Sequence, residues 1–177
     1  MQEFFTEILL PVKYGLLFAL ITLVYGFGLG GTFGAFEENI KQTLKNDARE
    51  VLATAYNGDE AKMKKIMDKS WVYFKRAHLH ANGLGTASLV LIVLVSFLPI
   101  NNKVKSINAI FLGVGSLGYA LFWMLAGLKA PGMGSTGLAK ESLAWLAFPS
   151  SGLCIIGLIM IVASVIISLF VKSEKQT

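Results

Sequence analysis

Cysteine and histidine are scarce in this sequence, and each scarcity excludes a class of site. The one cysteine, Cys154, lies inside an apolar run, so the chain has neither an internal disulfide nor a cysteine-based metal site. The only histidines are His78 and His80, which excludes a haem held by histidines from two helices of one chain. The sequence also lacks a nucleophile–His–acid pattern, a phosphate-binding loop and an H-E-x-x-H motif, so hydrolase and NTPase functions have no support.

Charged residues are few as well, at 15% of the chain against 54% hydrophobic residues, whereas soluble proteins are about a quarter charged. This balance predicts a small multi-pass membrane protein. The net charge is +5, but the basic residues gather at predicted helix ends and in one segment that also holds acids. That pattern favours lipid headgroups over nucleic acid. We expect the lipid bilayer and other membrane subunits, or further copies of this chain, as partners, and no nucleic acid.

The four prolines divide the chain, because proline is tolerated at the start of a helix and disfavoured inside it. Pro11 precedes the first predicted span, Pro99 follows the second, Pro131 follows the third and Pro149 precedes the fourth. Each predicted span has close to the ~20 residues that cross a bilayer. The four predicted spans are residues 12–36, 80–98, 106–129 and 150–171.

A charged segment, residues 37–78, separates the first two spans. Apolar residues recur there at helical spacing on both sides of Asn57-Gly58-Asp59, which combines a helix stop, a left-handed position and an N-cap. We therefore expect the first two spans to continue beyond the membrane as an antiparallel helical hairpin with facing apolar stripes. One stripe comprises Ile40, Leu44, Ala48, Val51, Leu52 and Ala55, and the other Met63, Ile66, Met67, Trp71 and Phe74.

Residues 138–148 have helical character but are too few to span a bilayer, which predicts a short interfacial or re-entrant helix. The predicted fold class is an all-α membrane protein with a single domain over residues 1–177. It consists of a bundle of four transmembrane helices, an extramembrane helical hairpin over residues 37–78, and a short interfacial helix before the fourth span.

The membrane orientation stays open. Eleven Lys and Arg lie on the side of the charged segment and five on the other, which favours a cytoplasmic hairpin. The five all lie close to span ends, however, and insertion with both termini inside is common. Glu3 and Glu7 stand where a secretory signal carries positive charge, so we expect the first span to be retained.

The end of the first span is rich in glycine. A G-x-G-x-x-G pattern occurs at Gly26, Gly28 and Gly31, but it lies in an apolar helix without a neighbouring strand, which argues against dinucleotide binding. Gly26, Gly30 and Gly34 follow at intervals of four residues. This spacing predicts a small-residue face that lets another helix approach closely.

Four crossings bring the polar residues of interest to one side of the membrane. Imidazole and carboxylate together suit zinc, iron or manganese, so a transition metal or haem iron is a candidate cofactor there. The candidate ligands are His78, His80, Glu37 and Glu38. Residues expected around that site, or lining a ligand pocket, are Arg76, Asn82, Lys140 and Glu141.

Helix geometry limits this hypothesis. His78 and His80 point about 200° apart on a continuous helix, so they cannot both bind one ion, and at most one is expected to face the bundle. We expect that residue to be His78, because it continues the stripe of Phe74 and has Asn82 one turn further on. In the alternative, both histidines are interfacial residues that bind the third connection or lipid phosphates, and Glu37 and Glu38 simply begin a solvated helix.

Two functions remain open at this point. The first is an integral membrane subunit of a redox or respiratory-type complex, whose polar site binds a metal, a haem iron or a quinone headgroup. The second is a non-catalytic structural or docking subunit of a larger membrane complex. The aromatic residues Tyr119, Phe122 and Trp123 similarly fit an interfacial belt or the wall of a pocket for a flat ligand.

Overall fold

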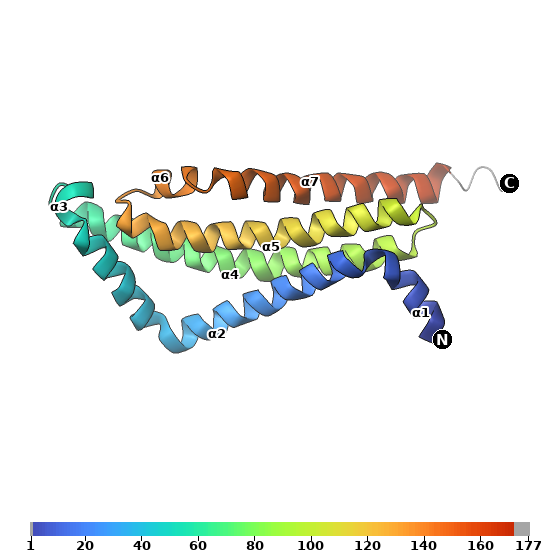
Figure 1. Ribbon diagram of the computed structural model, residues 1–177, viewed down its shortest axis with the longest axis horizontal. Coiled ribbons are helices and arrows are strands. Elements are labelled where there is room, and N and C mark those ends of the chain that lie inside the picture. The colour runs from blue at the N-terminus through green and yellow to red at the C-terminus, as the bar shows by residue number, and fades with distance from the viewer. Residues whose placement is uncertain (1, 172–177) are drawn as a thin grey trace.

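The structure is a computed structural model that describes residues 2–171, and within this range it is helical with no strand. Figure 1 shows long helices lying side by side, with α3 at one end of the molecule and α1 at the other. The helices are α1 (Gln2–Leu9), α2 (Lys13–Glu50), α3 (Leu52–Ala55), α4 (Glu60–Phe97), α5 (Asn102–Gly132), α6 (Thr136–Glu141) and α7 (Ala144–Ile166). A 3₁₀ turn (Leu10–Val12) precedes α2, and a π-helical turn (Ile167–Val171) follows α7.

Four helical stretches in this range are long and apolar enough to cross a membrane, as the sequence predicts. They are Glu3–Glu50, Glu60–Phe97, Asn102–Gly132 and Ala144–Phe170. The predicted class, an all-helical bundle with four candidate spans, is therefore confirmed.

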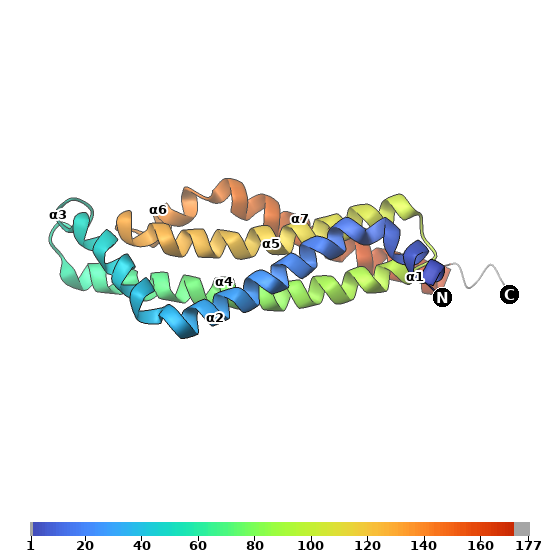
Figure 2. The ribbon, with the colours of Figure 1, turned by 60° about the horizontal axis from the view of Figure 1, so that its bottom comes forward.

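Helix α5 is the centre of the bundle, since it packs against α4, α2 and α7. Figure 1 shows α7 on the side of α5 opposite α4, and Figure 2 shows α6 and the start of α7 covering one end of α5. The outer face of α7 is apolar and exposed, for example at Ile155 (59%) and Ile159 (62%). Such a face is expected where lipid surrounds a helix.

Helix α2 bends sharply at Phe36, where the backbone leaves helical geometry (φ −130°, ψ 23°) (Figure 1). The glycine-rich stretch before it weakens the helix, and the Thr32 hydroxyl donates a hydrogen bond of 2.8 Å to the Gly28 carbonyl, an interaction that bends helices. The kink coincides with the predicted end of the first span.

The turn between α3 and α4 has the predicted chemistry. Asn57 and Gly58 both adopt positive φ, at 55° and 77°. Asp59 caps α4, because its carboxylate accepts a hydrogen bond of 2.8 Å from the Lys62 backbone N–H. These three residues therefore end one helix and start the next.

The apolar stripes of the charged segment pack against each other and also against the end of α5, which the sequence did not indicate. Leu44 and Phe74 belong to one buried cluster with Phe33. The Tyr56 hydroxyl donates to the Pro131 carbonyl at 2.7 Å, and burial raises the pKa of Tyr56. A second buried cluster joins the part of the charged segment around α3 to α5 and α6. It comprises Ala48, Tyr56, Met63, Ile66, Ala130 and Ala139.

Two predicted boundaries are wrong. The short helix is α6, residues 136–141, and not 138–148, because residues 144–148 form the first turns of α7. Pro149 therefore lies inside α7, where it removes one backbone donor. The hydroxyls of Ser150 and Ser151 donate to the carbonyls of Leu146 and Ala147 in the same turn. Pro131 likewise lies within the last turn of α5 and not after it.

Candidate functional site

His78 lies at the contact between α4 and α2. Its Nδ1 is 2.8 Å from the Gly26 carbonyl oxygen, so the imidazole carries its proton on Nδ1 and donates it to that oxygen. The Asn82 amide then donates to the His78 carbonyl, at 3.0 Å, from the next turn of the same helix. The hydrogen bond to Gly26 fixes the ring orientation and leaves the lone pair on Nε2.

Small residues on α2 make room for these two side chains. A Cβ atom on Gly30 would lie 2.7 Å from Cε1 of His78, and one on Gly26 would lie 2.8 Å from Oδ1 of Asn82. That amide oxygen is buried without a conventional hydrogen-bond partner. The α-hydrogen of Gly26 that takes the Cβ direction points at it and acts as a weak donor. Gly26 and Gly30 therefore form the predicted close-packing face, whereas Gly34 has no heavy atom within 4 Å of its Cβ position. Within residues 2–171, Gly34 therefore makes no close helix contact, and its part in the face stays a prediction.

His80 lies on the other side of α4, against α5. Its ring is 5.1 Å from the Tyr119 ring and 6.1 Å from the Trp123 ring, nearly parallel to the latter. The Arg76 guanidinium lies 4.8 Å from the Trp123 ring centroid, within cation–π distance. Tyr73 also packs edge-on against Trp123 at 5.0 Å. An aromatic and cationic cluster therefore joins α4 to α5.

Both histidines consequently contact another helix, contrary to the expectation that at most one faces the bundle. The expectation fails because α4 packs against both α2 and α5, so two of its faces contact a neighbouring helix. The 200° separation of His78 and His80 is real, and it directs each imidazole to a different neighbour. The His80 cluster was readable in principle from Tyr73, Arg76 and His80, which recur at helical spacing on one face.

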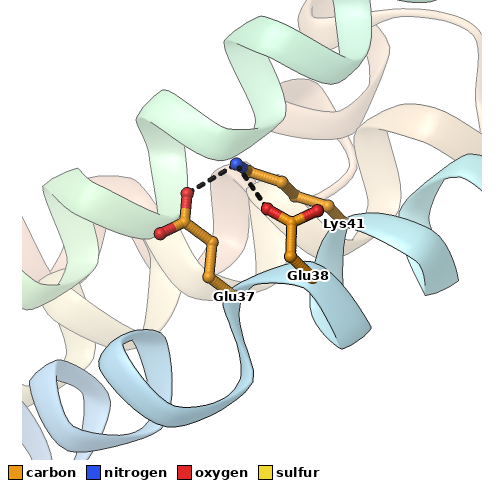
Figure 3. Close-up of polar contacts among 3 residues, drawn as sticks. All are labelled: Glu37, Glu38 and Lys41. Atoms are coloured by element: carbon orange, nitrogen blue, oxygen red, sulfur yellow. Dashed lines mark hydrogen bonds and ion pairs between the residues drawn. The ribbon is translucent and has the colours of Figure 1, made fainter.

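Glu37 and Glu38 do not join either histidine through any hydrogen bond or ion pair. Figure 3 shows both carboxylates reaching the ammonium group of Lys41, at 2.5 and 3.4 Å. The side chain of Glu38 is 87% exposed and that of Glu37 is 44% exposed. Among residues 2–171, no three His, Cys, Asp or Glu side chains lie close enough to hold a metal ion. The four predicted ligands therefore occupy three separate places.

Lys140 and Glu141 lie on α6 and form no hydrogen bond or ion pair with either histidine. Both line a pocket of about 450 Å³ between α5, α6 and α7, together with Tyr119, Phe122 and Trp123. Two of these aromatic residues are also the neighbours of His80, so this pocket and the His80 cluster share one wall. The arrangement offers an oriented imidazole at His78 and a polar and aromatic cavity beside α6. Comparison with family models, with curated proteins and with solved structures finds no match.

Proposed function

We propose that this chain is a non-catalytic membrane subunit that docks on a partner through its charged segment. Helix α4 has 38 residues, which is about 57 Å at 1.5 Å per residue, against a hydrocarbon thickness of about 30 Å. The charged segment, residues 37–78, contains nine Lys and Arg and seven Asp and Glu, so it is more stable in water than in the hydrocarbon core. The extramembrane hairpin therefore comprises the second half of α2, α3 and the first half of α4, and α6 lies at the interface.

The packing of the charged segment supports a docking role. Ser70 donates a hydrogen bond of 2.5 Å to the Gly127 carbonyl, and Tyr56 holds the end of α5 in the same way. The hairpin is thus fastened to α5 by buried contacts as well as by its own stripes. A preformed projection loses little conformational entropy on binding, which favours affinity.

The observation that carries the proposal is a lysine-rich hollow on the outer face of α4, of about 370 Å³. Lys64, Lys65 and Lys69 line it, together with Asp68 and the apolar Val72. Lys64 and Asp68 form a long ion pair of 3.8 Å, and the other two lysines have no ion pair among the residues that the structure describes. An acidic surface on a partner complements this hollow.

Charge reversal in the native membrane tests this function. The triple variant Lys64→Glu, Lys65→Glu and Lys69→Glu is expected to release the 19.2 kDa chain from a larger assembly on native gels. Lys103→Glu, at the other end of the bundle, is the matched control and is expected to leave the assembly intact. An assembly of unchanged size in the triple variant contradicts the proposal.

A second candidate, a subunit of a redox-type complex, is favoured by the orientation of His78. Metal-binding histidines commonly donate Nδ1–H to a carbonyl and bind through Nε2, which is the state that Gly26 imposes here. A haem iron or metal shared with another subunit would use that nitrogen. Bound pigment or metal in the purified complex is then expected to disappear in His78→Ala and to persist in His80→Ala. A complex that contains neither pigment nor metal contradicts this candidate.

A further inference from the structure

The pocket between α5, α6 and α7 is amphipathic. Its volume of about 450 Å³ lies within the range of small-molecule sites. Lys140 and Glu141 of α6 form its charged part, which we call the polar end, and α7 contributes Ala147, Phe148 and Ser151. Phe148 is 76% exposed, and the apolar outer face of α7 continues from there. The pocket thus has a polar end and an apolar part at Phe148 that is continuous with a lipid-facing surface.

One wall of the pocket is aromatic and firmly supported. The rings of Tyr119 and Phe122 are nearly parallel, with an interplanar angle of 26°, and Trp123 follows at 5.0 Å from Phe122. Phe122 is only 5% exposed, and Arg76 and His80 of α4 pack against Trp123. Trp123 is inclined by 84° to Tyr119 and by 58° to Phe122, so the wall is a rigid aromatic corner, and a planar ring stacks favourably on one of its faces.

The polar end carries two charged side chains, Lys140 and Glu141. Neither Lys140 nor Glu141 has an ion pair or a hydrogen bond through its side chain to any residue in the described range 2–171. An ammonium group offers three donors, and a carboxylate offers acceptors. Because the two charges are adjacent and opposite, they favour a headgroup without net charge over an anionic one. Lys140 would donate to a ring carbonyl of the quinone, and Glu141 would accept from a ring hydroxyl only in the reduced quinol form.

We propose that this pocket binds the headgroup of an isoprenoid quinone, with the ring on the Tyr119–Phe122–Trp123 wall and the tail along α7. The ring oxygens lie at the polar end, beside Lys140. This assignment concerns binding, and it is independent of the docking function of the charged segment. A phospholipid headgroup, the other amphiphile at this depth, would leave the aromatic wall without a planar partner.

Quenching of tryptophan fluorescence by a ubiquinone with a ten-carbon tail tests the proposal on the full chain in detergent micelles. Trp71, which packs in the charged segment against Phe33, is replaced by Phe so that the signal comes from Trp123 and Trp145. Quenching is expected to saturate. The half-saturating concentration is expected to rise about tenfold in Lys140→Gln, which removes one charge-assisted hydrogen bond.

Two further variants complete the test. Ala147→Phe fills the pocket and is expected to abolish the saturable component, while Lys103→Gln, at an exposed position at the other end of the bundle, is the matched control and leaves it unchanged. Lys140→Gln alters an exposed side chain, so it remains informative if Ala147→Phe does not fold. Equal quenching in the parent, Lys140→Gln and Ala147→Phe proteins would place the quinone in the micelle and overturn the proposal. Stoichiometric retention of a phospholipid that the quinone does not displace would overturn it as well.

Discussion

The two ends of the bundle are packed in different ways by the same helices. Near α1, backbones approach each other closely, since a Cβ on Gly113 would lie 2.5 Å from the Gly15 carbonyl oxygen. Beyond the kink of α2, toward α3, large side chains are prominent in the contacts, among them Leu44, Trp71 and Phe74. In lipid the hydrophobic effect does not drive helix association, so close backbone approach and dispersion must hold the helices together. In water, burial of large apolar side chains provides that drive.

This contrast supports the division into a membrane part and an extramembrane part. It also predicts which substitutions each end tolerates. Polar or charged replacements in the core should be most harmful toward α3, which we call the aromatic end. Added methyl groups should be most harmful near α1, where Gly15 and Gly113 meet, which we call the glycine end.

The largest effect is expected from charges placed in the core of the charged segment. Leu44 is 2% exposed and Ile66 is 8% exposed, so Leu44→Asp with Ile66→Asp buries two carboxylates without partners. Each such group costs several kcal/mol, and the segment should become sensitive to protease. The control pair, Thr43→Asp with Ala61→Asp, adds the same charge at exposed positions and should remain resistant. Equal protease resistance of both double variants would show that burial of Leu44 and Ile66 does not stabilise the aromatic end.

The next effect concerns the glycine end. Gly113→Ala places a methyl group against the Gly15 carbonyl, and overpacking of this kind costs about 1–3 kcal/mol. Gly152→Ala, on α7, meets no heavy atom within 4 Å and should gain up to about 1 kcal/mol of helix propensity. Thermal denaturation in detergent should therefore show a lower melting temperature for Gly113→Ala than for the parent, and an equal or higher one for Gly152→Ala. Similar melting temperatures would indicate that α2 and α5 separate easily.

A smaller effect is expected where the two ends meet, beside His78. Gly30→Ala adds a methyl group 2.7 Å from the imidazole, which must shift and lengthen its hydrogen bond to Gly26. Gly31→Ala is the matched control, since its methyl group points into open space. The melting temperature of Gly30→Ala should fall below that of Gly31→Ala by an amount equivalent to ~1 kcal/mol. If the two agree, the His78 contact does not constrain α2.

The sequence predicts those features of the fold that depend on neighbouring residues. Asn57, Gly58 and Asp59 indicate the turn because their local preferences suffice, and Phe36 marks a change from apolar to charged residues. The candidate site was predicted less well. The pairing of Glu37 with Lys41 follows the i,i+4 spacing and was readable from the sequence. The position of Glu37 relative to His78 depends on the direction in which α2 bends at Phe36, and no local pattern encodes that angle. The packing of α5 on the charged segment is likewise a contact between distant parts of the chain.

The smallest effect is expected from Tyr56, the residue that fastens the aromatic end to α5. Tyr56→Phe removes the hydrogen bond to the Pro131 carbonyl and should cost ~1 kcal/mol at neutral pH. Burial raises the pKa of Tyr56 above its ordinary value of 10.0, so the phenol ionises more readily when the segment opens. The stabilisation is therefore complete below pH 10 and declines as the pH rises through the higher folded-state pKa. The melting temperatures of the parent and Tyr56→Phe proteins should accordingly converge at alkaline pH, and a difference that stays constant from pH 7 to about pH 11 would show that the phenol is already accessible to water.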